Sequence, residues 1–446
     1  MESTTGTGRS FMSSDMTRRR ALQLFGLAAA LPAAASLAAC STGGGSGGST
    51  GSRKLTFVFL GNASQQKAVK AEYSGFVKAN PKVQFTAQGI AASNWAGFAN
   101  TVATRIAGGA APDVIDIATE GLGIFRSKKL IENLDTYIAK DKTAIDDYYA
   151  DLDPTYKKWS DEYGNPGGKT YYMPGGFNTV CLYCNTEVFQ KAGVDLPGNE
   201  DWTWDDFEAA AEKIKSKTGA FILPFGSAQF TDIMPWLLSN GASTLNEAWT
   251  KPVIDSPEAI EAAEFCKSMV DRGYSPKPGG NFDAATQLSQ GKLAALAGGR
   301  WPTIDMIRLN LVDKVQIVKM PKKKQLGTPI GWDAFPILTS SQNKDDAWSF
   351  IKYLTTKEAG QDFAKVGGTN IPARKSIALS DTFLKGAPKG SDLLYQAASY
   401  ATPVPSPNRG AESQQAVEQT WLKILTGGVA ADAGLKQLST TLSGLL

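Results

Sequence analysis

Residues 54–60 have the sequence KLTFVFL, a short run of β-branched and aromatic side chains that predicts a buried strand. Apolar residues then recur at helical spacing through residues 64–80, and Pro81 ends that pattern. Strands that alternate with helices predict an α/β fold with a parallel sheet and right-handed crossovers. The alternation continues in the order strand, helix, strand over residues 83–90, 95–106 and 113–117.

The carboxyl ends of these strands predict where a ligand binds, because ligands of open α/β sheets lie outside those ends. The three ends, residues 61–64, 91–95 and 118–121, are rich in small and polar side chains and contain no G-x-G-x-x-G or Walker motif. A phosphate cradle is therefore not supported. Asn62 is either a ligand contact or a turn residue, and Trp95 either faces the ligand or packs in the core.

The composition excludes several classes of active site. The chain contains no histidine, which removes Ser-His-Asp and Cys-His nucleophile systems, histidine-ligated metal sites and a histidine general base. The formal net charge is only +3, and the basic run at residues 322–324 fits a solvated loop. We therefore expect no nucleic-acid partner and no cofactor.

The cysteines give a weak signal. Cys181 and Cys184 have C-x-x-C spacing, but no second pair or histidine accompanies them, so a metal site is not expected. If the segment is a strand, the two side chains point to opposite faces. We interpret Cys181, Cys184 and Cys266 as buried thiols or a structural bridge rather than a redox centre.

The first 52 residues predict export and attachment to a membrane. Three arginines at positions 18–20 precede an apolar, alanine-rich run, and together they resemble a twin-arginine signal peptide over residues 1–39. Residues 37–40, LAAC, resemble a lipobox, in which Cys40 receives the lipid; the alternative is an ordinary signal peptide with a coincidental cysteine. Residues 41–52 are almost entirely Gly, Ser and Thr, which predicts a flexible tether at the outer face of the cell membrane.

The remaining chain is long enough for two domains, and several of its segments together resemble the family 1 extracellular solute-binding proteins, which include maltose- and oligosaccharide-binding proteins. At the position of Cys184 the family usually has a tyrosine. The resemblance extends in the right order over about 320 residues. The segments are AAPDVI at 110–115, KTYYMP at 169–174, CNTEVF at 184–189, TWDDF at 203–207, QGKLAAL with GGRW at 290–301, residues 343–354, and NIPAR at 370–374.

The resemblance implies a two-lobed, type II periplasmic-binding-protein-like fold with the ligand in a cleft between the lobes. Transferred onto this chain, lobe 1 comprises residues 53–172 and 331–375, and lobe 2 comprises residues 173–330 and 376–446. The implied function is the substrate-binding subunit of an ABC importer, a non-catalytic monomer that delivers a carbohydrate to the transmembrane subunits of a permease. A polyol or another solute is an alternative ligand.

Sugars need flat aromatic side chains for their C–H faces and polar groups for their hydroxyls, so the predicted site combines both types. By resemblance, Trp301 is a cleft aromatic and Glu120 is a carboxylate that binds sugar hydroxyls. Trp236 and Trp332 are either ligand contacts or core residues. Three charged residues have two possible roles: they form hydrogen bonds with the ligand in the cleft, or they form an ion-pair network between the lobes. These are Arg300, Asp333 and Arg374. Asn178 is a further candidate for a ligand contact.

Two other classes of function remain as alternatives. A surface-anchored carbohydrate-active enzyme needs only two carboxylates and no histidine, although no pair here has a recognisable hydrolase context. A structural surface lipoprotein or adhesin would bind no small molecule.

Overall fold

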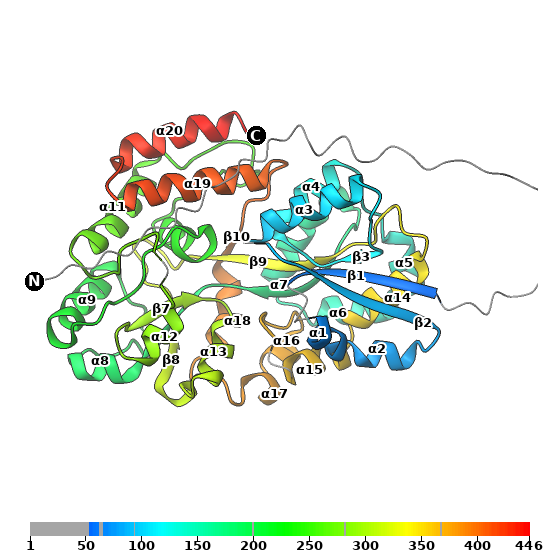
Figure 1. The fold of residues 1–446 in the computed structure, drawn as a ribbon, viewed down its shortest axis with the longest axis horizontal. Coiled ribbons are helices and arrows are strands. Elements are labelled where there is room, and N and C mark those ends of the chain that lie inside the picture. Colours follow the sequence, from blue (N-terminus) through cyan, green and yellow to red (C-terminus); the bar gives the residue numbers. More distant parts are fainter. Residues whose placement is uncertain (1–52, 62–65, 93, 199, 281, 366–367) are drawn as a thin grey trace, which may run out of the picture. The chain divides into compact units, whose positions relative to one another are not determined.

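The computed structural model describes residues 53–446 apart from 62–65, 93, 199, 281 and 366–367 (Figure 1). The predicted leader, the lipidation site at Cys40 and the candidate Asn62 lie outside the described residues. Within the described part of the chain, no helix combines the length and the apolar character needed to cross a membrane.

The first sheet confirms the predicted strand–helix alternation. Strand β1 (Arg53–Leu60) lies between β2 (Val83–Ile90) and β3 (Val114–Ile115), and both neighbours run parallel to it. Helix α3 (Trp95–Ala107) connects β2 to β3. It begins at Asn94, whose side chain accepts a hydrogen bond of 2.8 Å from the backbone N–H of Gly97 and so caps the helix.

Two predicted elements of this region are interrupted. The helix expected over residues 64–80 is divided at Tyr73 into α1 (Gln66–Glu72) and α2 (Ser74–Ala79). The strand expected over residues 113–117 is divided at Asp116 into β3 and β4 (Ile117–Ala118), because β3 pairs with β1 whereas β4 pairs antiparallel with β9 (Thr328–Phe335). Asp116 therefore lies where the chain leaves one sheet and joins the next.

Strand β9 is the centre of the second sheet. It also pairs antiparallel with β5 (Met173–Asn178) and parallel with β10 (Ala401–Pro403). In Figure 1 this yellow strand lies between the elements around β1 and β2 and the elements around α8 and α9. These strands coincide with the two crossings that the family resemblance predicts near residues 169–174 and 331.

The third sheet is antiparallel, with β6 (Cys181–Asn185) between β7 (Ala295–Gly298) and β8 (Val315–Val318). Phe221 makes an isolated bridge with Leu293 beside this sheet. A capping box starts α9 (Trp204–Thr218), where Thr203 and Asp206 cap each other's backbone.

Other helices surround the three sheets. They are α4 (Leu122–Ser127), α5 (Asp135–Lys140), α6 (Lys142–Ala150), α7 (Pro154–Trp159), α8 (Thr186–Ala192), α10 (Met234–Ser239), α11 (Pro257–Asp271), α12 (Ala284–Ser289), α13 (Pro302–Arg308), α14 (Lys344–Leu354), α15 (Lys357–Lys365), α16 (Lys375–Ala378), α17 (Asp381–Leu384), α18 (Asp392–Gln396), α19 (Gly410–Leu425) and α20 (Ala431–Ser443).

The apolar side chains form two main cores. The first includes β1, β2 and β9 and continues onto one face of β6, and the second is formed by the other face of β6 together with α9, α11, α19 and α20. Cys181 belongs to the first core and Cys184 to the second, as expected for opposite faces of a strand. Both are buried free thiols, as is Cys266, and burial raises the pKa of Cys181 to about 12, which does not suit a redox centre.

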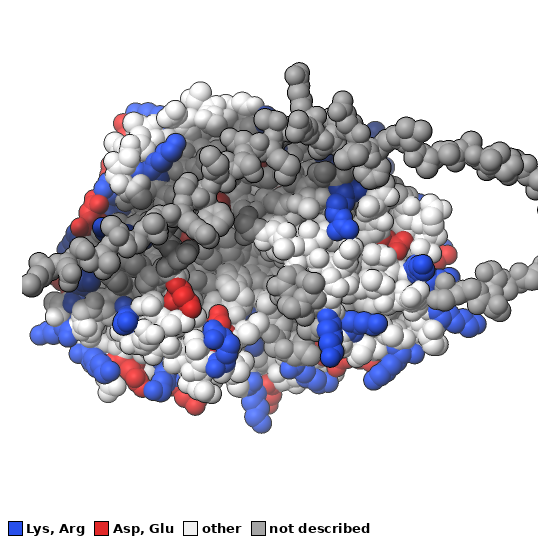
Figure 2. Space-filling model, viewed as in Figure 1, with Lys and Arg blue, Asp and Glu red and all other residues white. Residues whose placement is uncertain are grey.

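Charged side chains are dispersed over the surface. On the face shown in Figure 2, the described Lys and Arg residues lie around the rim with Asp and Glu residues among them. Several of these are helical pairs four residues apart, such as Lys142 with Asp146 at 2.5 Å. Exposed pairs of this kind contribute about 0.3–0.5 kcal/mol each, so the surface charges contribute to solubility more than to fold stability.

Candidate functional site

A cavity of about 550 Å³ lies beside the carboxyl end of β1, within the range of volumes that hold small-molecule ligands. Strand β1 supplies Phe57, Phe59 and Leu60, and helix α1 supplies Val69 and Glu72. The remaining walls come from the start of α3, from β5 and β9, from α15 and from residues 368–374. The site therefore lies at the strand ends, where the sequence places it.

Three carboxylates line this cavity from three different elements. Glu72 is the last residue of α1, Asp116 lies between β3 and β4, and Asp333 lies in β9. Burial raises the pKa of Glu72 to about 7, a hydrogen bond with Tyr73 opposes this, and the charge of Asp333 raises it further. The Asp116 pKa rises well above its ordinary value through burial and the charges of Asp333 and Glu72.

The third carboxylate has an amide partner. Asn370 donates a hydrogen bond from Nδ2 to Asp333 Oδ2, and both residues line the cavity. Burial raises the pKa of Asp333 to about 7 despite this bond, and the charge of Glu120 adds to the effect. By contrast, Asp116 Oδ1 is buried and finds no hydrogen-bond partner in the described part of the chain. These groups are positioned to donate to or accept from a polar ligand.

Aromatic and small residues complete the walls. Trp95, predicted as a ligand contact, lines the cavity together with Tyr148 and Phe335. A Cβ at Gly175 would clash with Phe335 Cε2, so a side chain there would displace that ring. The glycine thus allows β5 to approach the aromatic wall closely. An aromatic ring next to carboxylate and amide oxygens is the combination that a sugar requires.

Asn178 connects this cavity to the segment before Trp301. Its Nδ2 donates to Asn370 Oδ1 at 2.6 Å, and its Oδ1 accepts from the backbone N–H of Arg300 at 2.8 Å. Asn178 therefore positions Asn370. The Arg300 guanidinium is buried against the Phe383 ring at 4.3 Å and donates to Thr303 Oγ1 at 3.3 Å, so it braces residues outside the cavity.

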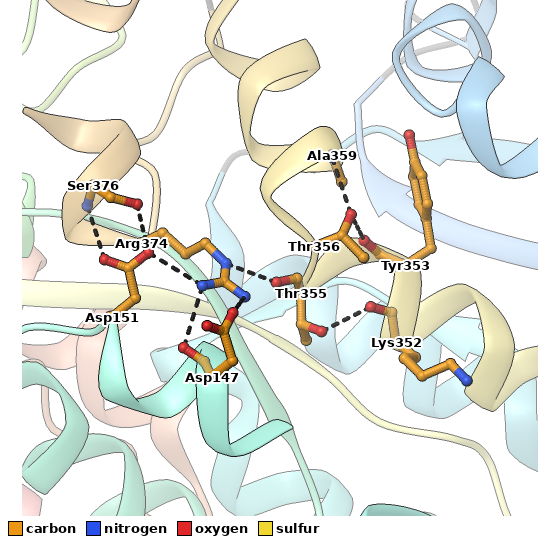
Figure 3. A network of polar contacts seen from close by, with 9 residues as sticks. All are labelled: Asp147, Asp151, Lys352, Tyr353, Thr355, Thr356, Ala359, Arg374 and Ser376. Carbon is orange, nitrogen blue, oxygen red and sulfur yellow. Dashed lines mark hydrogen bonds and ion pairs between the residues drawn. The ribbon is translucent and has the colours of Figure 1, made fainter. Parts of the chain in front are cut away.

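Arg374 forms a separate network at the edge of the cavity (Figure 3). Its Nη2 lies 2.9 Å from Asp147 Oδ2, its Nη1 lies 3.1 Å from Asp151 Oδ2, and its Nε donates to the carbonyl oxygen of Thr355 at 2.9 Å. Burial raises the pKa of Asp151, but hydrogen bonds from Ser376 and Arg374 outweigh it and leave the pKa below its usual value. Both acids belong to α6 or its carboxyl end, and Thr355 ends α14, so Arg374 holds α6 to α14 and to the start of α16 rather than offering a free charge.

Two of the candidate tryptophans are core residues. Trp236 is 1% exposed and packs within 6 Å of Trp204, Phe225 and Phe265, so its predicted role as a ligand contact is wrong. Trp332 is 2% exposed and packs at 6.0 Å against Tyr156, so it too is a packing residue. Helix α10 directs Trp236 into the second core, and the alternation of β9 directs Trp332 away from the face that carries Asp333.

Trp301 and Glu120 do not line the cavity. Trp301 is 37% exposed at the start of α13, and its ring lies 6.1 Å from that of Phe230. Glu120 lies in a 3₁₀ turn (Thr119–Gly121), where burial raises its pKa to about 7 against a hydrogen bond from its own backbone, and Glu418 raises it further. No described residue forms a hydrogen bond with its Oε2.

Of the predicted residues, the cavity therefore brings together Trp95, Asp333 and Arg374. Sequence reasoning missed Glu72, Asp116 and Asn370. The available signals were the acid in the middle of the apolar residues of VIDI and the position of Asn370 directly before the Ile-Pro pair, whereas Glu72 in the polar sequence of α1 gave none.

Comparisons with known proteins agree with this architecture. The sequence pattern of the bacterial extracellular solute-binding proteins matches residues 61–361. A protein of Brucella abortus named only as a binding protein is 26% identical over 75% of this chain and 82% of its own length. The arabinooligosaccharide-binding protein of Bacillus subtilis is 24% identical over 58% of this chain and 60% of its own length.

The fold is also that of solved structures. An ABC substrate-binding protein of Listeria monocytogenes, in complex with cycloalternan, matches with a TM-score of 0.75 and 24% identity over 88% of this chain and 98% of that chain. This similarity confirms the two-lobed, type II α/β fold that the sequence predicts. Since the family pattern also covers most of the chain, the protein belongs to the bacterial extracellular solute-binding protein family.

Proposed function

We propose that this chain is the substrate-binding subunit of an ABC importer and that it captures a carbohydrate in the cavity between β1, α1, β9 and α15. The observation that carries the proposal is the composition of that cavity, where Trp95 lies with three carboxylates and the Asn370 amide at the strand ends of a solute-binding fold. The names of an arabinooligosaccharide-binding relative and of a cycloalternan complex support a sugar as the ligand.

The proposed mechanism uses the residues of the cavity and those around it. Trp95 packs against the C–H face of a sugar ring, and Asn370, Asp333 and Asp116 exchange hydrogen bonds with its hydroxyls. Trp301 and Glu120, which lie outside the cavity, join the ligand when the lobes close. Asn178 and Arg374 act as positioning residues.

The lobes of this proposal comprise residues 53–172 with 331–375 and residues 173–330 with 376–446. Strands β5 and β9 connect them, which supports a hinge at this sheet. The first core extends across this boundary onto β6, so the hinge movement has to leave that shared packing intact.

Capture requires no catalysis, and we assign no catalytic residue. A glycoside hydrolase would use one carboxylate as an acid and another as a base or nucleophile, and the three carboxylates of the cavity leave this alternative to experiment. A protein that cleaves a bound oligosaccharide releases products, whereas a binding protein returns it intact.

The leader completes the proposed function. Residues 1–39 direct export, Cys40 carries the lipid, and residues 41–52 hold the folded body away from the outer face of the membrane. There the monomer delivers its ligand to the transmembrane subunits of the permease.

A thermal-shift screen of the purified protein against mono- and oligosaccharides, with chromatography of the recovered sugars, tests the proposal. A sugar present at a hundred times its dissociation constant stabilises the protein by about 2.7 kcal/mol and is recovered unchanged. Shortened products would indicate a hydrolase, and a panel without any stabilising sugar would indicate a structural lipoprotein or a ligand of another class.

A further inference from the structure

The cavity carries more negative than positive charge. Glu72, Asp116 and Asp333 line it, and among its described lining residues Arg374 is the single basic side chain. Arg374 already pairs with Asp147 and Asp151, so it does not neutralise the other three acids. The residues that adjoin the cavity in sequence but lie outside the described part, NASQ at 62–65 and VG at 366–367, contain no charged side chain.

Asp116 has an unpaired oxygen at this cavity. Its Oδ1 atom is buried and has no hydrogen-bond partner among the described residues, and the side chain lines a cavity that admits a small molecule. An unpaired buried carboxylate is costly, and the cost is removed by a proton or by a cation. Within the described ranges, no three Asp, Glu, Cys or His side chains lie close enough to hold a metal ion, so the geometry favours an organic cation.

We propose that the solute is an amino sugar, whose ammonium group pairs with Asp116 in the cavity that Glu72 and Asp333 also line. The inference rests on the proposed function, because it assumes a carbohydrate in this cavity. An ammonium group has three donors and no acceptor, which matches an unpaired carboxylate oxygen. Trp95 packs against the same sugar and also attracts the cation through its ring face.

Proton release distinguishes this ligand from a neutral sugar. The titratable and charged groups that face the site are Glu72 at the end of α1, Tyr73 between α1 and α2, Asp116, Tyr148 from α6, Asp333 from β9, and Arg374. The charge of Glu120 also acts on Asp333. Burial raises the pKa of Glu72 and of Asp333 to about 7, so near neutral pH part of this cluster is protonated. A bound cation stabilises the ionised carboxylates and so releases those protons, whereas a neutral sugar carries no charge that would release them.

The test is calorimetric titration of the wild-type protein with matched pairs: glucose and glucosamine, galactose and galactosamine, mannose and mannosamine, and the β-1,4-linked dimers of glucose and of glucosamine. In at least one pair the amino member binds roughly tenfold or more tightly than the neutral member, as a charge-assisted hydrogen bond requires. Titrations in two buffers of different ionisation enthalpy show net proton release, and the affinity rises between about pH 5.5 and pH 7.

Neutral sugars that bind at least as tightly as their amino counterparts, or amino sugars that bind without proton release, overturn the inference and leave the proposed function standing. A protein that binds neither member of any pair, and no other carbohydrate, contradicts the proposed function itself.

Variants locate the charge. In Asp116→Asn and Glu72→Gln the ratio of amino-sugar to neutral-sugar affinity falls towards one, because each replacement removes a charge and keeps the shape. Asp146→Asn is the matched control, since this exposed carboxylate of α6 pairs with Lys142 outside the cavity, and it keeps the wild-type ratio. An unchanged ratio in both cavity variants, measured on cooperatively unfolding protein, overturns the placement of the ammonium group.

Discussion

The sequence around Asp116 predicts a buried strand but not that the Asp116 side chain lines a cavity. The run DVIDI predicts a buried strand, and Val114, Ile115 and Ile117 are indeed fully buried. The acid faces a cavity because its partners come from distant segments, with Asp333 more than 200 positions away along the chain. No local periodicity contains that information, whereas Trp95 could be predicted because a helix start after a strand has a fixed place at the sheet edge.

At this scale the first prediction concerns Glu72→Gln. The folded-state pKa of Glu72 is about 7 against an ordinary 4.5, so the folded protein holds this proton more tightly than the unfolded chain. The contribution of Glu72 to stability is therefore greatest below pH 4.5 and is lost as the pH rises to 7. Glutamine cannot ionise, so relative to wild type the variant gains stability over this range, by at most about 3 kcal/mol.

Denaturant unfolding of both proteins at pH 5 and pH 8 measures that gain. Glu212→Gln, which changes an exposed acid of α9, serves as the control and shows no such trend. An equal stability difference between wild type and Glu72→Gln at the two pH values would contradict the buried, proton-holding carboxylate.

Elements explain why similar tryptophans have different roles. Trp236 and Trp301 both adjoin a proline at a helix start, and sequence alone left both as candidates. Helix α10 packs against α11 and β9, so its tryptophan is enclosed, whereas α13 leaves Trp301, Ile304 and Ile307 partly exposed. The helices themselves were predictable from caps and apolar spacing, but the neighbour that covers each face was not.

A paired substitution tests this difference. Trp236→Ala removes a fully enclosed ring and lowers the unfolding free energy by about 3–5 kcal/mol, while ligand affinity of the folded fraction is preserved. Trp301→Ala leaves the unliganded melting temperature nearly unchanged but weakens ligand binding roughly fivefold or more, since the ring acts after closure. If Trp301→Ala lowered the unfolding free energy and Trp236→Ala weakened ligand binding instead, Trp301 would be the core residue and Trp236 the ligand contact.

Glu120→Gln, like Trp301→Ala, is expected to weaken ligand binding without destabilising the unliganded protein. The turn that carries Glu120 is buried, and its Oε2 has no hydrogen-bond partner among the described residues, so in our proposal lobe closure brings a ligand hydroxyl to this oxygen. We expect roughly fivefold weaker binding with an intact unliganded protein, measured by titration with the sugar that the thermal-shift screen selects. Full affinity in Glu120→Gln would remove this residue from the site.

On the scale of the whole molecule, the two cores and the pairing of β5 with β9 are the basis of the proposed hinge. The order of strands and helices from β1 to β3 could be anticipated from sequence, because it follows from strand–helix alternation. The division of the β6 side chains between the two cores could not be anticipated from sequence. It depends on which face of this short strand each core covers.

Attachment of the molecule is tested by Cys40→Ser. The variant should leave the membrane fraction and keep its ligand affinity, because the cavity lies beyond the tether at residues 41–52. Fractionation with a salt wash, followed by titration of the released protein, makes both measurements. Retention of the variant in the washed membranes would contradict a lipid anchor at this cysteine.

The central claim is that one carbohydrate binds in the cavity beside β1, and calorimetric titration of wild type and Trp95→Ala with the selected sugar tests it most directly. We predict saturable binding of one ligand per chain, with a negative heat-capacity change from the buried apolar surface. We predict binding weakened roughly fivefold or more in Trp95→Ala. Saturable binding of equal strength in both proteins would place the ligand elsewhere, and the absence of binding to any carbohydrate by a cooperatively folded wild type would contradict the account.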